Sequence, residues 1–176
     1  MTFIKHLLYL LLLPTVMYGQ TVHIDDGRIV YKGAVKVGQI NKDELYETAK
    51  QSIYDNIKES KANTIKDDRQ NGKICVKGII TLATPYEIIR TVGYVLELSV
   101  EEGGYKYRID SVYMKQVQRG GRTMTVPSTV VFKGIEATGP EAVEAEKLLN
   151  EIDLNFQKIL TLISNDISKQ AVVKTQ

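Results

Sequence analysis

The stretch Lys73–Met114 decides the fold, and it reads KICVKGIITLATPYEIIRTVGYVLELSVEEGGYKYRIDSVYM. Every second residue from Val92 to Val100 is apolar, and the residues between them are mostly polar or glycine. A period of two predicts a strand with one buried face. The adjacent Gly103 and Gly104 suit a two-residue hairpin turn, whose central positions need positive φ. The alternation resumes after the turn, so the stretch predicts a long β-hairpin.

The hairpin register follows if Glu102 pairs with Tyr105. Leu98 then faces Ile109 and Glu101 faces Lys106. The full set of expected pairs is Val100–Tyr107, Leu98–Ile109 and Tyr94–Tyr113 on the apolar side, and Glu101–Lys106 and Ser99–Arg108 on the charged side. Only Val95 and Ser111 do not fit their faces. A slip of one residue would mix the two faces, so we expect this register.

Residues 1–19 have the pattern of a secretory signal peptide. Lys5 and His6 precede the apolar run Leu7–Leu13, which is too short to span a bilayer because a spanning helix needs ~20 apolar residues. We expect cleavage after Gly19, export to the periplasm or the cell exterior, and no membrane span in the mature chain. An uncleaved N-terminal anchor is the alternative. Residues 20–28 are expected to be a loose N-terminal segment.

The charges and the sparse reactive residues restrict the function. Lys and Arg number 23 and Asp and Glu 21, and loss of residues 1–19 removes one lysine and no acid, leaving a net charge of +1. This balance gives no reason to expect nucleic acid as a partner. His23 is the only histidine after cleavage, which argues against a His-rich metal site or a Ser-His-Asp triad. We therefore expect no catalytic residues, no metal and no cofactor.

Cys75 is the only cysteine, so the exported chain has no internal disulfide and must be held together by packing. Its place in an apolar strand run favours a small hydrophobe. A reactive thiol, an intermolecular disulfide, or a dyad with His23 are the alternatives.

Before the hairpin, an amphipathic helix is expected from Asn41 to Lys58. Asn41 caps it, Glu44 lies in its first turn, and apolar residues recur every four positions. The neighbouring expected elements are strands at Ile29–Val37, Thr64–Asp68 (an edge strand) and Lys73–Thr84 (with a bulge at Gly78), and a turn at Arg69–Gly72.

After the hairpin, residues 116–139 are expected to form an irregular insertion, with Thr129–Phe132 as a candidate strand. A long helix follows over residues 140–168, and residues 169–176 are expected to fray. At about 1.5 Å per residue the helix would be about 40 Å long, longer than the ~33 Å of a ten-residue strand. Its apolar stripe continues to its far end, so Ile159, Ile163 and Ile167 are a candidate interface with a protein partner or a second copy. The alternative is that residues 116–139 fold back and cover them.

The order β-α-β-β-β-β-α predicts one α+β domain over residues 29–168. A strand meander with segregated helices indicates a single antiparallel sheet with both helices on one face.

Several motifs resemble a family of exported Bacteroidetes domains of unknown function with a TATA-binding-protein-like (TBP-like) fold. They are Asn41-Lys-Asp-Glu-Leu-Tyr at the helix start, Gly72-Lys-Ile before a strand that carries Lys77-Gly78, and Tyr105-Lys-Tyr-Arg-Ile after the hairpin. The resemblance covers Ile29–Gln118. It implies a TBP-like topology, which agrees with the order above, and it brings no catalytic residues.

The polar face of the sheet is the candidate binding surface, formed by Lys32, Lys36, Lys77, Glu97, Lys106 and Arg108. The plainer interpretation is a solvated face with cross-strand ion pairs. We expect an exported non-enzymatic binding or structural domain of the bacterial envelope. The alternatives are an envelope enzyme that uses carboxylates or tyrosine, and a small-molecule carrier with a pocket between helices and sheet.

Overall fold

The computed structural model describes residues 22–25, 28–58, 63–82, 89–117, 121–127 and 138–173. The expected signal peptide and the candidate strand Thr129–Phe132 lie outside these residues.

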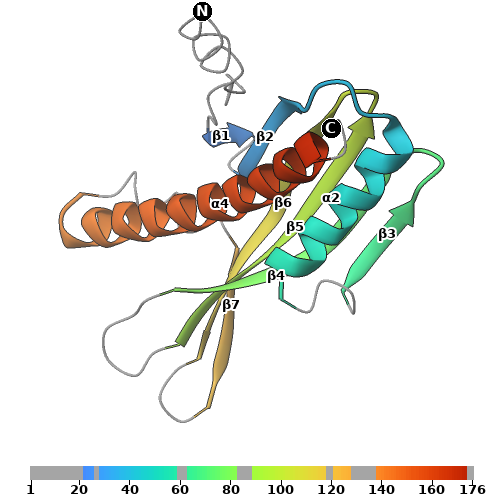
Figure 1. The fold of residues 1–176 in the computed structure, drawn as a ribbon. Coiled ribbons are helices and arrows are strands. Elements are labelled where there is room, and N and C mark those ends of the chain that lie inside the picture. The colour runs from blue at the N-terminus through green and yellow to red at the C-terminus, as the bar shows by residue number, and fades with distance from the viewer. Residues whose placement is uncertain are drawn as a thin grey trace, which may run out of the picture.

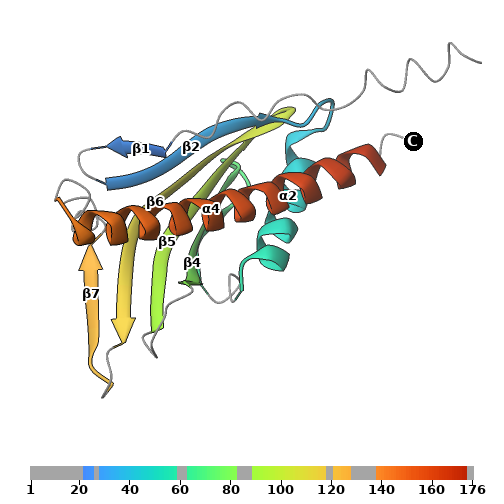
Figure 2. The ribbon, with the colours of Figure 1, turned by 90° about the vertical axis from the view of Figure 1, so that its left-hand side faces the viewer.

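The described chain forms one antiparallel sheet of seven strands with two helices over one face (Figures 1 and 2). The main path of the sheet runs β1-β2-β6-β5-β4-β3, and β7 pairs with β6. This arrangement confirms the α+β class and the placement of both helices on one face. The strands are β1 (Val22–Asp25), β2 (Arg28–Lys36), β3 (Thr64–Asp68), β4 (Lys73–Leu82), β5 (Ile89–Glu101), β6 (Gly104–Val117) and β7 (Thr123–Pro127), and the helices are α2 (Lys42–Asn56) and α4 (Pro140–Val173).

Two strands lie where the sequence predicted none. Val22–Asp25, expected to be loose, forms β1 and pairs with β2. In the stretch expected to be irregular, β6 continues to Val117 and Thr123–Pro127 pairs with it as β7. Both additions are short outer strands with weak alternation, so their pairing depends on the neighbouring strand more than on their own sequence.

Helix α2 begins as the sequence predicted. The Asn41 side chain accepts a hydrogen bond from the Glu44 backbone N–H at 2.8 Å, which caps the first turn. Leu45, Ala49 and Ile53 are fully buried against the sheet. The helix ends at Asn56, two residues before the expected end at Lys58, because Ile57 has an extended backbone.

The hairpin register differs from the expected one by two residues. Glu101 pairs with Gly104, Leu98 with Tyr107 and Leu96 with Ile109. The turn is Glu102-Gly103, with Gly103 at φ 70°, instead of Gly103-Gly104. Because a strand has a period of two, this shift changes every partner but leaves each side chain near the turn on its expected face.

A bulge reverses the alternation further along β6. The pairing of β5 with β6 shifts between Gly93 and Val95, and Ser111 there has φ 53°, rare for a residue with a side chain. Val112 and Met114 therefore enter the core, and Tyr113 lies over Gly93 on the opposite face. The expectation that Tyr113 is buried with Tyr94 is wrong for this reason.

Gly78 is not a bulge. The pairing of β4 with β5 runs without a shift from Lys73–Ser99 to Leu82–Arg90. Gly78 instead leaves room for the ring of Tyr94, which a Cβ at this position would overlap.

The core lies between the helices and the sheet. The rings of Tyr31 and Tyr94 each meet Phe156 of α4 edge-on, with centroids 5.0 Å apart. The buried stripe of α4 consists of Ile152, Phe156, Leu160, Ile163 and Ile167. Among the described residues, aromatic and aliphatic side chains thus pack together in the layer in which a carrier would need a ligand pocket.

The far end of α4 packs on α2, which corrects the expected interface. Ile163 is 1% exposed and Ile167 is 0% exposed, while Ile159 is partly buried against the same core. Ser52 of α2 donates a hydrogen bond to the Ile163 carbonyl at 3.3 Å, and Asn56 donates one to Asp166 at 2.7 Å. Helix α4 also continues to Val173, five residues beyond its expected end at residue 168.

Candidate functional site

The six residues expected on the polar face all lie on the face of the sheet that the helices leave open, here called the outer face. Lys32 of β2 pairs with Arg108 of β6, which pairs with Glu97 of β5. Lys106 lies next to Ser99 in the neighbouring row, and Lys77 is on β4. Lys32, Lys36, Lys77, Lys106 and Arg108 are exposed, and Glu97 is partly exposed. The structure therefore brings the predicted residues together on one surface that spans four strands.

Part of the charge on the outer face is paired. Lys106 and Glu101 form an ion pair at 2.6 Å although they are not directly opposite, and Lys73 lies 3.6 Å from Glu97. Within the described part of the chain, no ion pair involves Lys32, Lys36 or Lys77. The three lysines without an ion-pair partner in this part of the chain leave the surface with an excess of accessible lysine. The exposed ion pairs themselves contribute little to stability.

An apolar row continues the outer face beyond the bulge. Ile79 of β4 is 61% exposed and pairs with Gly93 of β5, over which the Tyr113 ring lies. Val95 is the next outer residue of β5 and is partly buried. The outer face thus combines a charged part near the hairpin turn with a small apolar cluster of Ile79, Val95 and the Tyr113 ring, and the exposed Lys115 ammonium lies 5.6 Å from the centroid of that ring.

Cys75 also lies on the outer face, opposite Glu97. Burial of the thiol raises its pKa, and the negative charges of Glu97 and Asp110 raise it further. A raised pKa keeps the sulfur protonated and weakly nucleophilic at neutral pH. This environment suits the small hydrophobe expected from the sequence better than a reactive thiol.

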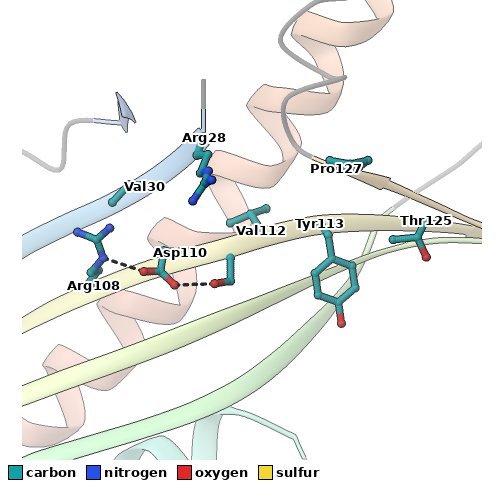
Figure 3. A pocket seen from close by; sticks show the side chains of 9 residues that line it. Arg28, Val30, Arg108, Asp110, Val112, Tyr113, Thr125 and Pro127 are labelled. Carbon is teal, nitrogen blue, oxygen red and sulfur yellow. Dashed lines mark hydrogen bonds and ion pairs between the residues drawn. The ribbon is translucent and has the colours of Figure 1, made fainter. Parts of the chain in front are cut away.

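A notch opens in the sheet edge where β2 and β7 meet the same side of β6. Pairing of β2 with β6 ends at Tyr31–Ile109, and pairing of β7 with β6 ends at Tyr113–Pro127. Among the described strands, residues 110–112 of β6 therefore have no partner on this side. The notch holds a pocket of about 330 Å³ lined by Arg28, Val30, Arg108, Asp110, Ser111, Val112, Tyr113, Thr125 and Pro127 (Figure 3).

The polar groups of the notch are ordered around Asp110. The Arg108 Nε lies 2.8 Å from Asp110 Oδ2, and the Ser111 hydroxyl donates to Asp110 Oδ1 at 3.0 Å. Arg28 is exposed and has no ion-pair partner among the described residues. Sequence reasoning singled out Arg108 alone here. The one signal of the notch was Ser111, a polar residue on an apolar face.

A second charged cluster joins α2 to the edge strand β3. Asp67 accepts hydrogen bonds from the Tyr46 hydroxyl and the Lys50 ammonium, both at 2.5 Å. The hydrogen bond from Lys50, followed by that from Tyr46, lowers the pKa of Asp67. Hydrogen bonds from Asn71 and Lys66 likewise lower the pKa of Asp68 to about 2. A general acid needs a raised pKa, so both carboxyl groups fit a structural role.

The described residues hold no group of three or more His, Cys, Asp or Glu side chains placed to bind a metal. Neither described helix combines the length and the apolar character needed to cross a membrane.

Comparison with known proteins identifies the fold. Residues 31–115 match the family described as a domain of unknown function (DUF4468) with TBP-like fold, which confirms the resemblance read from the sequence. A crystal structure of a TBP-like protein from Parabacteroides distasonis superposes with a TM-score of 0.64 at 11% identity, covering 82% of this chain and 97% of that chain. A DUF4468 family protein from Bacteroides ovatus superposes with a TM-score of 0.56 at 14% identity, covering 81% and 90%. No curated protein matches the chain.

Proposed function

Starting from its resemblance to this domain family, we propose that the chain is an exported, non-enzymatic binding domain of the bacterial envelope, which holds a protein partner or a second copy against its outer face. Export rests on the signal-peptide pattern of residues 1–19. Binding without catalysis rests on the chemistry of the described side chains.

One observation carries this proposal. Both helices cover the same face of the sheet, so the other face presents an exposed surface across four strands. That surface joins Lys32, Lys36 and Lys77, which have no ion-pair partner among the described residues, to the exposed Ile79 and the Tyr113 ring. Aromatic and aliphatic groups beside charged ones are typical of protein interfaces, whereas the near-neutral net charge of the chain does not favour nucleic acid.

The rival functions have less support. A carboxylate enzyme would need acids gathered in a cleft, one of them with a raised pKa, whereas Asp67 and Asp68 both have lowered pKa values. A small-molecule carrier would need space between the layers, where Tyr31, Tyr94 and Phe156 pack together.

The test is capture of partners by the mature protein, residues 20–176, from an envelope extract of the organism that encodes it, followed by mass spectrometry. The double variant Lys32→Glu and Lys77→Glu reverses two charges of the outer face at positions that do not line the notch. Lys147→Glu and Lys158→Glu make the same charge change on exposed positions of α4 and serve as the matched control.

We expect the wild type and the α4 variant to retain the same partner and the outer-face variant to lose it, with unchanged circular dichroism. Sedimentation of each protein shows whether a second copy is the partner. A wild type that is monomeric and captures no protein would refute the proposal. Capture that depends on the α4 lysines but not on the outer face would refute it as well.

A further inference from the structure

We propose that the notch between β2 and β7 binds an extended peptide segment that carries a carboxylate, with its backbone paired to residues 110–112 and its carboxylate on Arg28. This inference rests on the proposed function, because it specifies which part of a protein partner the domain holds.

The interrupted pairing of β6 is the first argument. Among the described strands, residues 110–112 of β6 have no partner on the side of β2 and β7, a gap of about 10 Å at about 3.3 Å per residue. The residues of β2 that precede Tyr31 pair with β1 and, among the described strands, not with β6, and Arg28 there pairs with Asp25. A short extended segment could complete the ladder, as in other cases of β-strand addition. The pocket of about 330 Å³ lies at the lower end of the size range of ligand sites.

The charge of the notch is the second argument, because it selects an anionic group. The notch holds two guanidinium groups, Arg28 and Arg108, and one carboxylate, Asp110. Arg108 is already engaged with Asp110. Arg28 remains as the cation available to a ligand among the described residues, and guanidinium groups bind carboxylates through paired hydrogen bonds.

The apolar part of the lining is the third argument. Val112, the Tyr113 ring and Pro127 lie along the β6 and β7 sides of the pocket (Figure 3). Because Val112 lies on the helix-covered face and Tyr113 on the outer face, they offer apolar contact to successive side chains of an extended segment. A residue with φ 53°, Ser111, lies at the centre of the unpaired segment, and strained backbone of this kind often occurs at binding sites.

Synthetic peptides provide the probe. Acetyl-Thr-Val-Thr-Val with a free C-terminal carboxylate is compared with its C-terminal amide and with acetyl-Thr-Glu-Thr-Val-amide. The first and third peptides separate a terminal carboxylate from a side-chain carboxylate. Binding to the full mature protein is followed by the NMR shifts of its backbone amides and by calorimetry.

We expect shifts centred on Asp110, Ser111 and Val112 with at least one carboxylate peptide, and about tenfold weaker binding of the uncharged amide. Arg28→Gln should weaken binding of the carboxylate peptide about tenfold, because one charge-assisted contact is lost. Lys158→Gln, which removes an exposed cation from α4, should change it less than about twofold.

Shifts at another edge of the sheet, the absence of binding by all three peptides, or equal affinity for acid and amide with no effect of Arg28→Gln would each overturn the inference. These outcomes are distinguishable from failure of the proposed function. A partner captured through Lys32 and Lys77, which do not line the notch, would leave that function intact even if no peptide entered the notch.

Discussion

Tyr94 lies across the strand pair β4–β5 directly over Gly78, in the space that a side chain at position 78 would occupy. The same ring meets Phe156 of α4 edge-on, at a centroid distance of 5.0 Å. Gly78 thereby allows an aromatic side chain of the sheet to reach the helix layer. The glycine is needed for its lack of a Cβ, because its backbone shows no bulge.

We expect Gly78→Ala to destabilise the protein by ~1–3 kcal/mol, since the new methyl group overpacks against a ring fixed by Phe156. Denaturant melts measure the change, with Thr81→Ala on the outer face of the same strand as control, expected within ~0.5 kcal/mol. In a Tyr94→Leu background the cost of Gly78→Ala should fall, because the overlapping ring is absent. An equal cost in both backgrounds would contradict this explanation.

The two faces of β5 should respond very differently to truncation. Leu98 is fully buried, so Leu98→Ala should cost ~2–5 kcal/mol in the free energy of unfolding. Its neighbour Glu97 lies on the outer face, 3.6 Å from Lys73, and Glu97→Ala should cost less than ~0.5 kcal/mol. The same urea titration measures both, and a larger loss for Glu97→Ala would refute the assignment of the faces.

The sequence pattern predicted the sheet face of each side chain better than it predicted the cross-strand partner of each residue. The alternation in β5 placed Leu98 inside and Glu97 outside, but the pairing of Leu98 with Ile109 was wrong. Alternation cannot distinguish two registers that differ by two residues, because both leave every side chain on the same face. The run Glu102-Gly103-Gly104 allows two turn positions that differ by that shift. No glycine marks the bulge at Ser111 in the sequence. The reversal of the alternation along β6, which places Tyr113 on the outer face, could therefore not be predicted from composition.

The Asp67 carboxylate should make stability depend on pH in the acid range. Lys50 and Tyr46 lower the folded-state pKa of Asp67 below its unfolded value near 3.9. The unfolded state therefore takes up the proton first, and the stabilisation is complete above the unfolded pKa and lost as pH falls through the folded pKa. We expect Asp67→Asn to cost ~1 kcal/mol at pH 7, a modest value because solvent screens this partly exposed pair.

Urea melts of wild type and Asp67→Asn from pH 7 to pH 2 measure this dependence. The difference between the two proteins should stay constant above about pH 5 and shrink below about pH 4. Asp55→Asn, at an exposed position of α2, is the control and should alter stability by less than ~0.5 kcal/mol. A difference between wild type and Asp67→Asn that grows on acidification would have the wrong sign for a lowered pKa.

The candidate site was predictable only where it depends on alternation within strands. Lys32, Lys36, Lys77, Glu97, Lys106 and Arg108 share a face because their strands pair in one sheet, and the period-two pattern shows this. The notch depends instead on where two ladders end along β6. Arg28 and Thr125 come together there through the pairing of β1 and β7, which the sequence did not reveal.

The last prediction concerns the far end of α4, which the sequence alone marked as a candidate interface. A helix of 34 residues is about 51 Å long and does extend along the sheet, but α2 lies against its C-terminal part. Ile163→Asp and Ile167→Asp place unpaired charges in that buried contact, so the pair should cost more than ~4 kcal/mol and abolish cooperative unfolding.

Leu154→Asp and Leu162→Asp make the same change on exposed positions of the helix, 65% and 40% exposed, and should leave the fold intact. Circular dichroism and sedimentation of the two double variants separate the roles. An Ile163 and Ile167 variant that stays folded and only dissociates an oligomer would show that these residues form an interface. Residues of the core could not accept two carboxylates without unfolding.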